Sequence, residues 1–269
     1  GGVPKYIELF SESSDIYRAI QKCVLNRSGY LYDEPHFLLQ QEVSEVGSYF
    51  SIIKAIAAGN HKLSTIAAVL EVKSTNLTKY LKTLMDLDIL ERRVPITEGN
   101  PEKSKRGLYK IKDNYLRFWF AFIYPNMSFI ESGHSGIVMD KIRRGLTTSH
   151  IGFVYEDICQ ERMWELNVNN AWPFQFSKLG GYWDAKNEID IAALDPEGKN
   201  LILGECKYWK EPVGLNVLHA LEAKACDVAW ERDRRKVWYV LFSISGFSDE
   251  LRNHAATRDD LLLIDDRGR

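Results

Sequence analysis

Hydrophobic residues between positions 44 and 111 recur first with helical spacing and then with strand spacing. A stripe at i, i+3, i+4, i+7 and i+11 predicts one amphipathic helix, and its members are Val46, Tyr49, Phe50, Ile53 and Ala57. Further helices are predicted at 64–70 and 74–87, followed by strands at 89–94 and 107–111. Three helices and a two-stranded hairpin are typical of a winged helix-turn-helix.

After residue 149 the pattern changes to helices mixed with strands. Apolar spacing predicts helices at 153–164, 211–229 and 249–256, and strands at 173–179, 189–194, 201–207, 237–245 and 261–264. The turn-rich segment 195–200 makes the second and third strands a hairpin. We therefore expect α/β overall: an all-α and winged-helix N-terminal part, then an α/β domain with a central mixed sheet.

The expected domain organisation has four parts. Residues 1–43 hold two predicted helices, around 14–25 and 34–43, and the winged helix covers 44–124. Its last stretch, 113–124, is rich in Phe, Tyr and Trp at helical spacing, which favours core packing over stacking on bases. Residues 125–149 are expected to be a linker with Gly133 and Gly136, and 150–269 the α/β domain.

Composition indicates a folded soluble protein. The 269 residues are 45% hydrophobic and 27% charged, which is ordinary for such proteins. Every apolar run is shorter than the ~18 residues of a membrane span, and no signal peptide is visible. The four cysteines have neither C-x-x-C nor zinc-site spacing. We expect a cytoplasmic protein with reduced thiols and no membrane partner.

The net charge of −2 hides a basic segment. Residues 60–112 carry eleven Lys and Arg against six Asp and Glu, as in a DNA-facing module of an otherwise acidic protein. The outer face of the helix at 74–87 and the hairpin tip have residue types that reach phosphates and base edges. The predicted DNA contacts are Thr75, Asn76, Lys79, Lys82, Lys103, Lys105 and Arg106. The alternative is a winged helix that binds another protein.

The segment L-I-L-G-E-C-K at 201–207 places two charged residues in an apolar strand. Such charges are costly unless they are paired or bind an ion. Because strand side chains alternate, Glu205 and Lys207 share a face, Cys206 takes the other, and the hairpin brings Asp190 alongside. Glu156, on the helix at 153–164, can approach the same edge. Carboxylates grouped in this way suit Mg²⁺ (or Mn²⁺), with Lys207 orienting a water or stabilising charge.

Glu156 on a helix, Asp190 on a strand and Glu205-Cys206-Lys207 on the next resemble the PD-(D/E)XK signature of restriction-endonuclease-like nucleases. Glycines at 180–181 and 204 strengthen the resemblance. It implies that Asp190 and Glu205 are metal ligands, Lys207 the catalytic lysine and Glu156 an accessory ligand. Glu188 is a possible substitute on the strand of Asp190. The implied activity is cleavage of phosphodiester bonds in DNA by metal-activated water.

The whole chain is similar to the C-terminal half of prokaryotic AAA-type ATPases of the archaeal ATPase group. The residues that carry this resemblance are Gly1-Gly2-Val3-Pro4, like the end of an ATPase lid, the aromatic helix ending at Pro125-Asn126, and the acidic signature. No G-x-x-x-x-G-K-[ST] occurs, so this chain is not expected to bind ATP, and an ATPase domain would lie upstream. Two functions stay open: a Mg²⁺-dependent DNA nuclease, and a non-catalytic DNA-binding or protein-interaction module of an ATPase.

Overall fold

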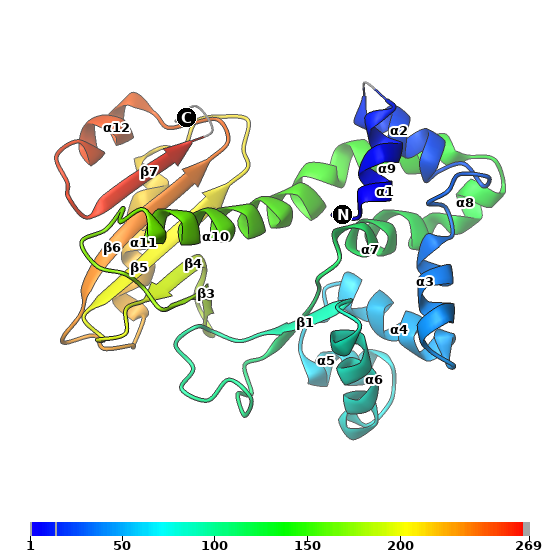
Figure 1. The fold of residues 1–269 in the computed structure, drawn as a ribbon, viewed down its shortest axis with the longest axis horizontal. Coiled ribbons are helices and arrows are strands. Elements are labelled where there is room, and N and C mark those ends of the chain that lie inside the picture. Colours follow the sequence, from blue (N-terminus) through cyan, green and yellow to red (C-terminus); the bar gives the residue numbers. More distant parts are fainter. Residues whose placement is uncertain (1, 14, 266–269) are drawn as a thin grey trace. The chain divides into compact units, whose positions relative to one another are not determined.

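A computed structural model describes residues 2–13 and 15–265 of the protein (Figure 1). It contains two compact units, one formed by residues 1–93 and 107–150 and the other by 94–106 and 151–269. The expectation of an α/β protein overall is confirmed, since helices and a mixed sheet are both present. Gly1 of the lid-like segment and the helix start expected near Ser14 lie outside the described residues.

The first unit begins with helices and contains the elements expected between residues 44 and 111. It starts with α1 (Pro4–Ser11), α2 (Ile16–Cys23) and α3 (Glu34–Glu42). Then follow α4 (Val46–Ala57), α5 (Leu63–Val69), α6 (Ser74–Asp86) and the antiparallel pair β1 (Leu90–Arg93) and β2 (Leu108–Ile111). The inner face of α6 is buried through Leu77, Leu81 and Leu84. Apolar periodicity therefore gave these elements to within about two residues.

The rest of the first unit is helical and corrects the linker prediction for 125–149. It consists of α7 (Asn114–Phe118), the π-helix η1 (Trp119–Ile123), the 3-10 helix η2 (Tyr124–Asn126), α8 (Met127–Glu131), α9 (Ser135–Leu146) and the π-helix η3 (Thr147–Ile151). Trp119 and Phe120 are buried, so the aromatic stretch is core, as expected. The linker prediction is wrong because Gly133, at φ +82°, only separates α8 from α9. α9 then buries Val138, Met139, Ile142 and Leu146.

The second unit is built on a five-stranded mixed sheet. Its strands are β3 (Lys178–Trp183), β4 (Glu188–Leu194), β5 (Asn200–Lys207), β6 (Lys236–Ser243) and β7 (Leu261–Asp265), in the spatial order β3-β4-β5-β6-β7. Neighbours are antiparallel from β3 to β5 and parallel from β5 to β7. The helices are α10 (Gly152–Val168), α11 (Leu215–Asp227) and α12 (Asp249–Ala255). The predicted mixed sheet is confirmed.

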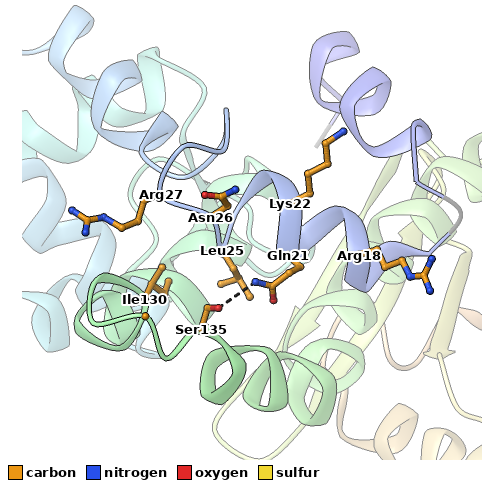
Figure 2. A pocket seen from close by; sticks show the side chains of 9 residues that line it. Arg18, Gln21, Lys22, Leu25, Asn26, Arg27, Ile130 and Ser135 are labelled. Atoms are coloured by element: carbon orange, nitrogen blue, oxygen red, sulfur yellow. Dashed lines mark hydrogen bonds between the residues drawn. The ribbon is translucent and has the colours of Figure 1, made fainter.

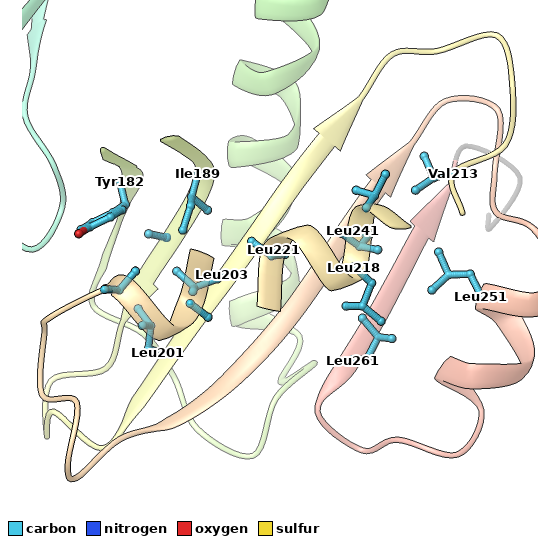
Figure 3. Packing of buried hydrophobic residues seen from close by; sticks show 14 of the residues in the cluster. Tyr182, Ile189, Leu201, Leu203, Val213, Leu218, Leu221, Leu241, Leu251 and Leu261 are labelled. Atoms are coloured by element: carbon cyan, nitrogen blue, oxygen red, sulfur yellow. The ribbon is translucent and has the colours of Figure 1, made fainter. Parts of the chain in front are cut away.

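Both faces of this sheet are covered by apolar side chains. Figure 3 shows one face, where Leu203 of β5 lies near Leu221 of α11, and the same cluster includes Leu201 and Leu218. The opposite face packs against α10, and its cluster includes Cys159, Met163, Ile202 and Cys206. Odd positions of β5 therefore face α11 and even positions face α10. Glu205 and Lys207 have the parity of the α11 face, as the alternation predicted.

A β-bulge interrupts β4 at Asp190. Gly180 of β3 pairs with Ala192 and Tyr182 pairs with Ile189, so Gly181 alone is opposite two residues of β4. In agreement, Ile189 belongs to the cluster on the α11 face and Ile191 to the cluster on the α10 face. A bulge of this kind changes which way side chains point, and here it puts Ile189 and Ile191, which flank Asp190, on opposite faces of the sheet.

The segment 94–106 lies along the outer strand of this sheet. Ile96 N–H donates to the Gly181 carbonyl at 3.0 Å, and Trp183 Nε1 donates to the Arg106 carbonyl at 3.1 Å. A Cβ on Gly180 would lie 3.4 Å from Ile96 Cδ1, so the glycine lets the two segments pack closely. The expectation that this segment is only the tip of a winged-helix hairpin is therefore corrected, because it forms part of the α/β unit.

The strand predicted at 173–179 begins only at Lys178. Asn167 at the end of α10 holds the preceding backbone, because its Nδ2 donates to the Phe176 carbonyl and its Oδ1 accepts from Phe176 N–H, both at 3.0 Å. These bonds take the place of strand pairing.

Candidate functional site

Three charged side chains of β4 and β5 meet where β5 ends. Lys207 Nζ lies 2.5 Å from Glu205 Oε2 and 3.6 Å from Asp190 Oδ2. Asp190 Oδ2 also accepts a 2.8 Å hydrogen bond from the backbone N–H of Cys206. The side chains of Asp190, Glu205 and Lys207 are 17%, 6% and 20% exposed. Two carboxylates from neighbouring strands therefore share one ammonium group in a mostly buried setting.

A second lysine, which the sequence analysis did not identify, completes this centre. Lys224 Nζ donates to Glu205 Oε1 at 2.6 Å and to the Glu188 carbonyl at 2.7 Å. Glu205 thus has one lysine on each carboxylate oxygen. The only signal in the sequence is the place of Lys224 beside the buried stripe of α11, between Leu221 and Ala225. That stripe packs on the sheet face to which Glu205 belongs.

The local sequence positions Glu205 through the glycine before it. A Cβ on Gly204 would lie 2.6 Å from Val240 Cγ1 and 2.9 Å from the Val240 carbonyl oxygen. Only glycine therefore fits where β5 passes β6 at this point. The residue that follows carries the buried carboxylate, and Asp190 reaches it from the bulge in β4. We infer that the bulge and the glycine together set the geometry of the centre.

Burial and charge give the two carboxyl groups opposite pKa shifts. Burial and, after it, the neighbouring charge of Glu205 together raise the pKa of Asp190 to about 6, against the opposing effect of Lys207. Burial also acts to raise the pKa of Glu205, but Lys207 and Lys224 outweigh it and hold that pKa below its usual value. The pKa of Lys207 is raised, because Asp190 and Glu205 together outweigh its burial. At neutral pH both carboxyl groups are therefore ionised, and the ammonium group of Lys207 contacts both of them.

Glu156, the expected accessory ligand, lies on α10, half-buried. Its negative charge contributes to the raised pKa of Cys206, whose largest cause is burial. α10 contacts the centre itself through Gln160, whose Nε2 donates to the Asp190 carbonyl at 3.4 Å. The side chain of Glu188, the possible substitute, is exposed, and only its carbonyl takes part.

Two carboxylates fit a magnesium site. Across residues 2–13 and 15–265, no three or more His, Cys, Asp or Glu side chains are grouped to hold a metal ion. Mg²⁺ is commonly held by one or two carboxylates and keeps several waters. Asp190 and Glu205 match this requirement, and the ammonium group of Lys207 already lies where both carboxylates attract a cation.

The expected DNA contacts fall in both units. Thr75, Asn76, Lys79 and Lys82 are exposed on α6 of the first unit. Lys103, Lys105 and Arg106 are exposed in the segment 94–106 of the second unit, where the side chain of Arg106 pairs with Glu98. The position of this segment follows from two contacts. The Arg106 carbonyl accepts a hydrogen bond from Trp183, and Trp183 is the strand partner of Glu188, whose carbonyl binds Lys224 of the centre. The basic segment 103–106 therefore lies at the end of the sheet that carries the carboxylates.

A separate shallow pocket of about 540 Å³ lies in the first unit (Figure 2). Gln21 Nε2 donates to Ser135 Oγ at 3.2 Å across it. Figure 2 shows Arg18, Lys22 and Arg27 pointing away from one another, and Lys22 is paired with Glu12 at 2.9 Å. The cationic groups of this pocket do not converge on one ligand.

Comparison with known proteins gives two similarities. Residues 119–225 match a family, DUF234, described as archaeal and bacterial proteins of unknown function. The uncharacterized protein MJECL04 of Methanocaldococcus jannaschii is 38% identical over 210 residues, which are 78% of this chain and 46% of that protein. The chain thus spans about half the length of this curated relative. The family match includes Asp190, Glu205, Lys207 and Lys224 and excludes α6.

Among the described helices, none has the length and apolar character needed to cross a membrane.

Proposed function

We propose that the α/β unit cleaves phosphodiester bonds in DNA with the help of Mg²⁺ or Mn²⁺ held by Asp190 and Glu205. The observation that supports this proposal best is the shared ammonium group, because Lys207 Nζ contacts both carboxylates at 2.5 and 3.6 Å. Two buried carboxylates aimed at one cation are expensive to maintain without a functional reason. A site role explains why they are placed at the end of a strand.

Two carboxylates are a donor set that supports such an ion, and Asp190, with a pKa of about 6, is ionised at pH 7 and above. When bound, the metal would polarise the phosphate and lower the pKa of a water. Asp190 and Glu205 would hold it, and the Cys206 N–H would keep Asp190 oriented. The contribution of this chain is to position those oxygens.

The two lysines of the centre would have different roles. Lys224 stays on Glu205 Oε1 and keeps that carboxylate ionised. Lys207, whose two partners would turn to the metal, is then free to donate a hydrogen bond to the phosphate or to the attacking water. In the hydrolysis the water oxygen would form a bond to phosphorus as the bond to the leaving oxygen breaks. The proton that the water gives up would pass to solvent, and the leaving oxygen would take one from solvent. Such a division needs two lysines on one carboxylate, which is the arrangement seen here.

DNA would be bound by the basic residues at 103–106 beside the centre and by α6, with α4 to α6 and β1–β2 acting as a winged helix-turn-helix. The exposed side chains of Lys79 and Lys82 support this role for α6. The similarity to C-terminal halves of AAA-type ATPases makes an ATPase domain in the parent polypeptide a candidate partner. The length of the relative supports this proposal, because the region that matches this chain makes up only 46% of that protein.

The test is cleavage of plasmid DNA by the purified chain with Mg²⁺ or Mn²⁺. Asp190→Ala and Lys207→Ala should each abolish nicking. Lys199→Ala is the matched control, because Lys199 is an exposed lysine on the same hairpin, and its ammonium group pairs with Glu197, which is also exposed. Equal cleavage by wild type and both site variants would reveal a contaminating nuclease, and absence of cleavage by wild type would end the proposal.

A non-catalytic DNA-binding or regulatory module is the second candidate. It is favoured by the absence of a three-ligand metal cluster among the described residues and by Lys207, which already neutralises the carboxylates. On this alternative, Lys79→Glu with Lys82→Glu should weaken DNA binding and flatten its salt dependence, while no variant cleaves DNA. If the double variant binds DNA as wild type does, α6 is a protein-binding surface instead.

A further inference from the structure

Trp209 follows the centre directly along the chain. β5 ends at Lys207, and residues two apart in an extended chain point to the same side. Glu205, Lys207 and Trp209 therefore share one parity. In agreement, the centroid of the Trp209 ring lies 5.7 Å from Lys207 Nζ. The indole adjoins the ammonium group that the two carboxylates share.

The indole is exposed, although its backbone is fixed. Trp209 is 47% exposed, and its carbonyl accepts a 2.5 Å hydrogen bond from Ser245 Oγ. The preceding residue, Tyr208, packs against Tyr155 with ring centroids 5.5 Å apart. The exposed ring offers a flat apolar surface. Because the backbone that carries it is already held in place, little conformational entropy is lost when a partner binds.

Other tryptophans of this unit have packing partners. Trp172 and Trp238 are buried, and Trp183 binds the Arg106 carbonyl. Trp164, which is exposed to a similar extent at 44%, packs on Phe176 at 4.9 Å. Within the described part of the chain, no aromatic ring packs on Trp209. A single exposed apolar residue needs no explanation by itself. The position of Trp209 beside the ammonium group of Lys207, however, indicates a functional role for its exposure.

We propose that Trp209 is a stacking platform for an unpaired nucleobase, so that the centre acts on DNA with unpaired nucleotides next to the cleaved bond. This inference rests on the proposed phosphodiester chemistry at Asp190 and Glu205. A phosphate at Lys207 would place the base of a neighbouring nucleotide within reach of the ring. A base inside a duplex is covered on both faces by its neighbours, whereas an unpaired base has a free face to stack on an aromatic side chain. Lys210, exposed and next in the chain, adds a positive charge for the backbone.

The experiment uses the full chain in Ca²⁺ buffer and a fluorescent base analogue. The probes are a DNA hairpin with a short single-stranded 5′ or 3′ tail, carrying 2-aminopurine at the first unpaired position, and the same hairpin with a blunt end. Stacking on an indole quenches 2-aminopurine. The variants are Trp209→Leu, which keeps an apolar side chain without an aromatic face, and Trp209→Phe, which keeps a smaller one. Trp164→Phe is the matched control at the other exposed tryptophan.

Wild type should bind a tailed hairpin about tenfold more tightly than the blunt one and quench the probe. Trp209→Leu should lose that preference and the quenching, Trp209→Phe should keep part of both, and Trp164→Phe should behave as wild type. Quenching by Trp209→Leu equal to that of wild type overturns the proposal, as does equal wild-type affinity for blunt and tailed hairpins. Circular dichroism shows whether Trp209→Leu is folded, and Trp209→Phe provides a second test if it is not.

The outcome is separable from that of the proposed hydrolysis. Quenching through Trp209 without any cleavage in Mg²⁺ or Mn²⁺ would leave the stacking site standing and remove the nuclease proposal. Cleavage that needs Asp190 but is indifferent to Trp209→Leu, on tailed and blunt DNA alike, would do the reverse. If neither hairpin binds, the stacking proposal fails, and cleavage of plasmid DNA decides the nuclease proposal by itself.

Discussion

Replacement of Asp190 by Asn should stabilise the protein at pH 8 in the absence of metal. Burial and the neighbouring Glu205 raise the pKa of Asp190 from 3.8 to about 6. The folded state therefore holds this proton more tightly than the unfolded chain does, and the stability of wild type falls as pH rises from about 4 to about 6. Asn does not ionise, so the variant avoids that loss. It can still accept the hydrogen bond from Cys206 N–H.

The magnitude follows from the size of the shift. A change of roughly two pH units corresponds to about 3 kcal/mol at most. This figure already includes the attraction of Lys207, whose 3.6 Å contact with Asp190 acts to lower that pKa. Because Asn stands in for the protonated carboxyl group, we expect the variant to be more stable by about 2–3 kcal/mol at pH 8 and no more stable at pH 4.

Urea unfolding in EDTA, followed by tryptophan emission from pH 4 to pH 8, measures this difference. Six of the seven tryptophans belong to the α/β unit, so the emission reports mainly on that unit. Glu197→Gln is the control, because Glu197 is an exposed carboxylate on the same hairpin, and it should have little effect at any pH. Added Mg²⁺ should stabilise wild type and not Asp190→Asn.

A variant less stable than wild type at pH 8 would refute the reasoning. So would a difference between the two proteins that stays constant from pH 4 to pH 8, because it would show that ionisation of Asp190 has no part in it.

Two further predictions concern residues around the centre. Lys224→Met should lower the free energy of unfolding by about 1–2 kcal/mol at pH 7 through loss of its charge-assisted bond to Glu205. Since the two lysines lower the pKa of Glu205 in the folded state, this loss should fade as pH falls below 4.5 in the same urea titration. Gly204→Ala should cost about 2 kcal/mol or more, because its Cβ would lie 2.6 Å from Val240 Cγ1. Gly47→Ala, whose Cβ would meet nothing within 4 Å, should be neutral or slightly stabilising in thermal unfolding, and the opposite order of the two alanine variants would count against the clash.

Strand alternation and the hairpin turn were enough to predict three residues of the centre. Alternation placed Glu205 and Lys207 on one face and Cys206 on the other, and the clusters on the two sheet faces agree. The turn brought Asp190 beside them, as its 3.6 Å contact with Lys207 shows, but the bulge opposite Gly181 was not predicted. A bulge depends on the register between strands, which a single segment does not reveal.

The role of Lys224 and the position of segment 94–106 were not predicted either, because both depend on contacts between distant parts of the chain. Lys224 lies 19 positions after Glu205, and its partner is decided by how α11 crosses the sheet. The basic tip at 103–106 was expected on a free hairpin, but Ile96 binds Gly181, 85 positions later in the chain. Local pattern gives the type of an element, whereas contacts between distant segments depend on packing. The linker prediction for 125–149 failed for another reason. It depended on Gly133 and Gly136, whereas the apolar residues that follow them have helical spacing and form the buried side of α9.

The path of segment 94–106 means that the polypeptide passes from one unit to the other three times, after Arg93, Arg106 and His150. A gene fragment encoding only 151–269 would therefore lack segment 94–106, which is part of the α/β unit. The backbone of β3 near Gly180 and Gly181 would be uncovered and open to pairing with a second molecule. Dissection of this protein calls for circular permutation or a grafted 94–106 peptide instead of a single cut.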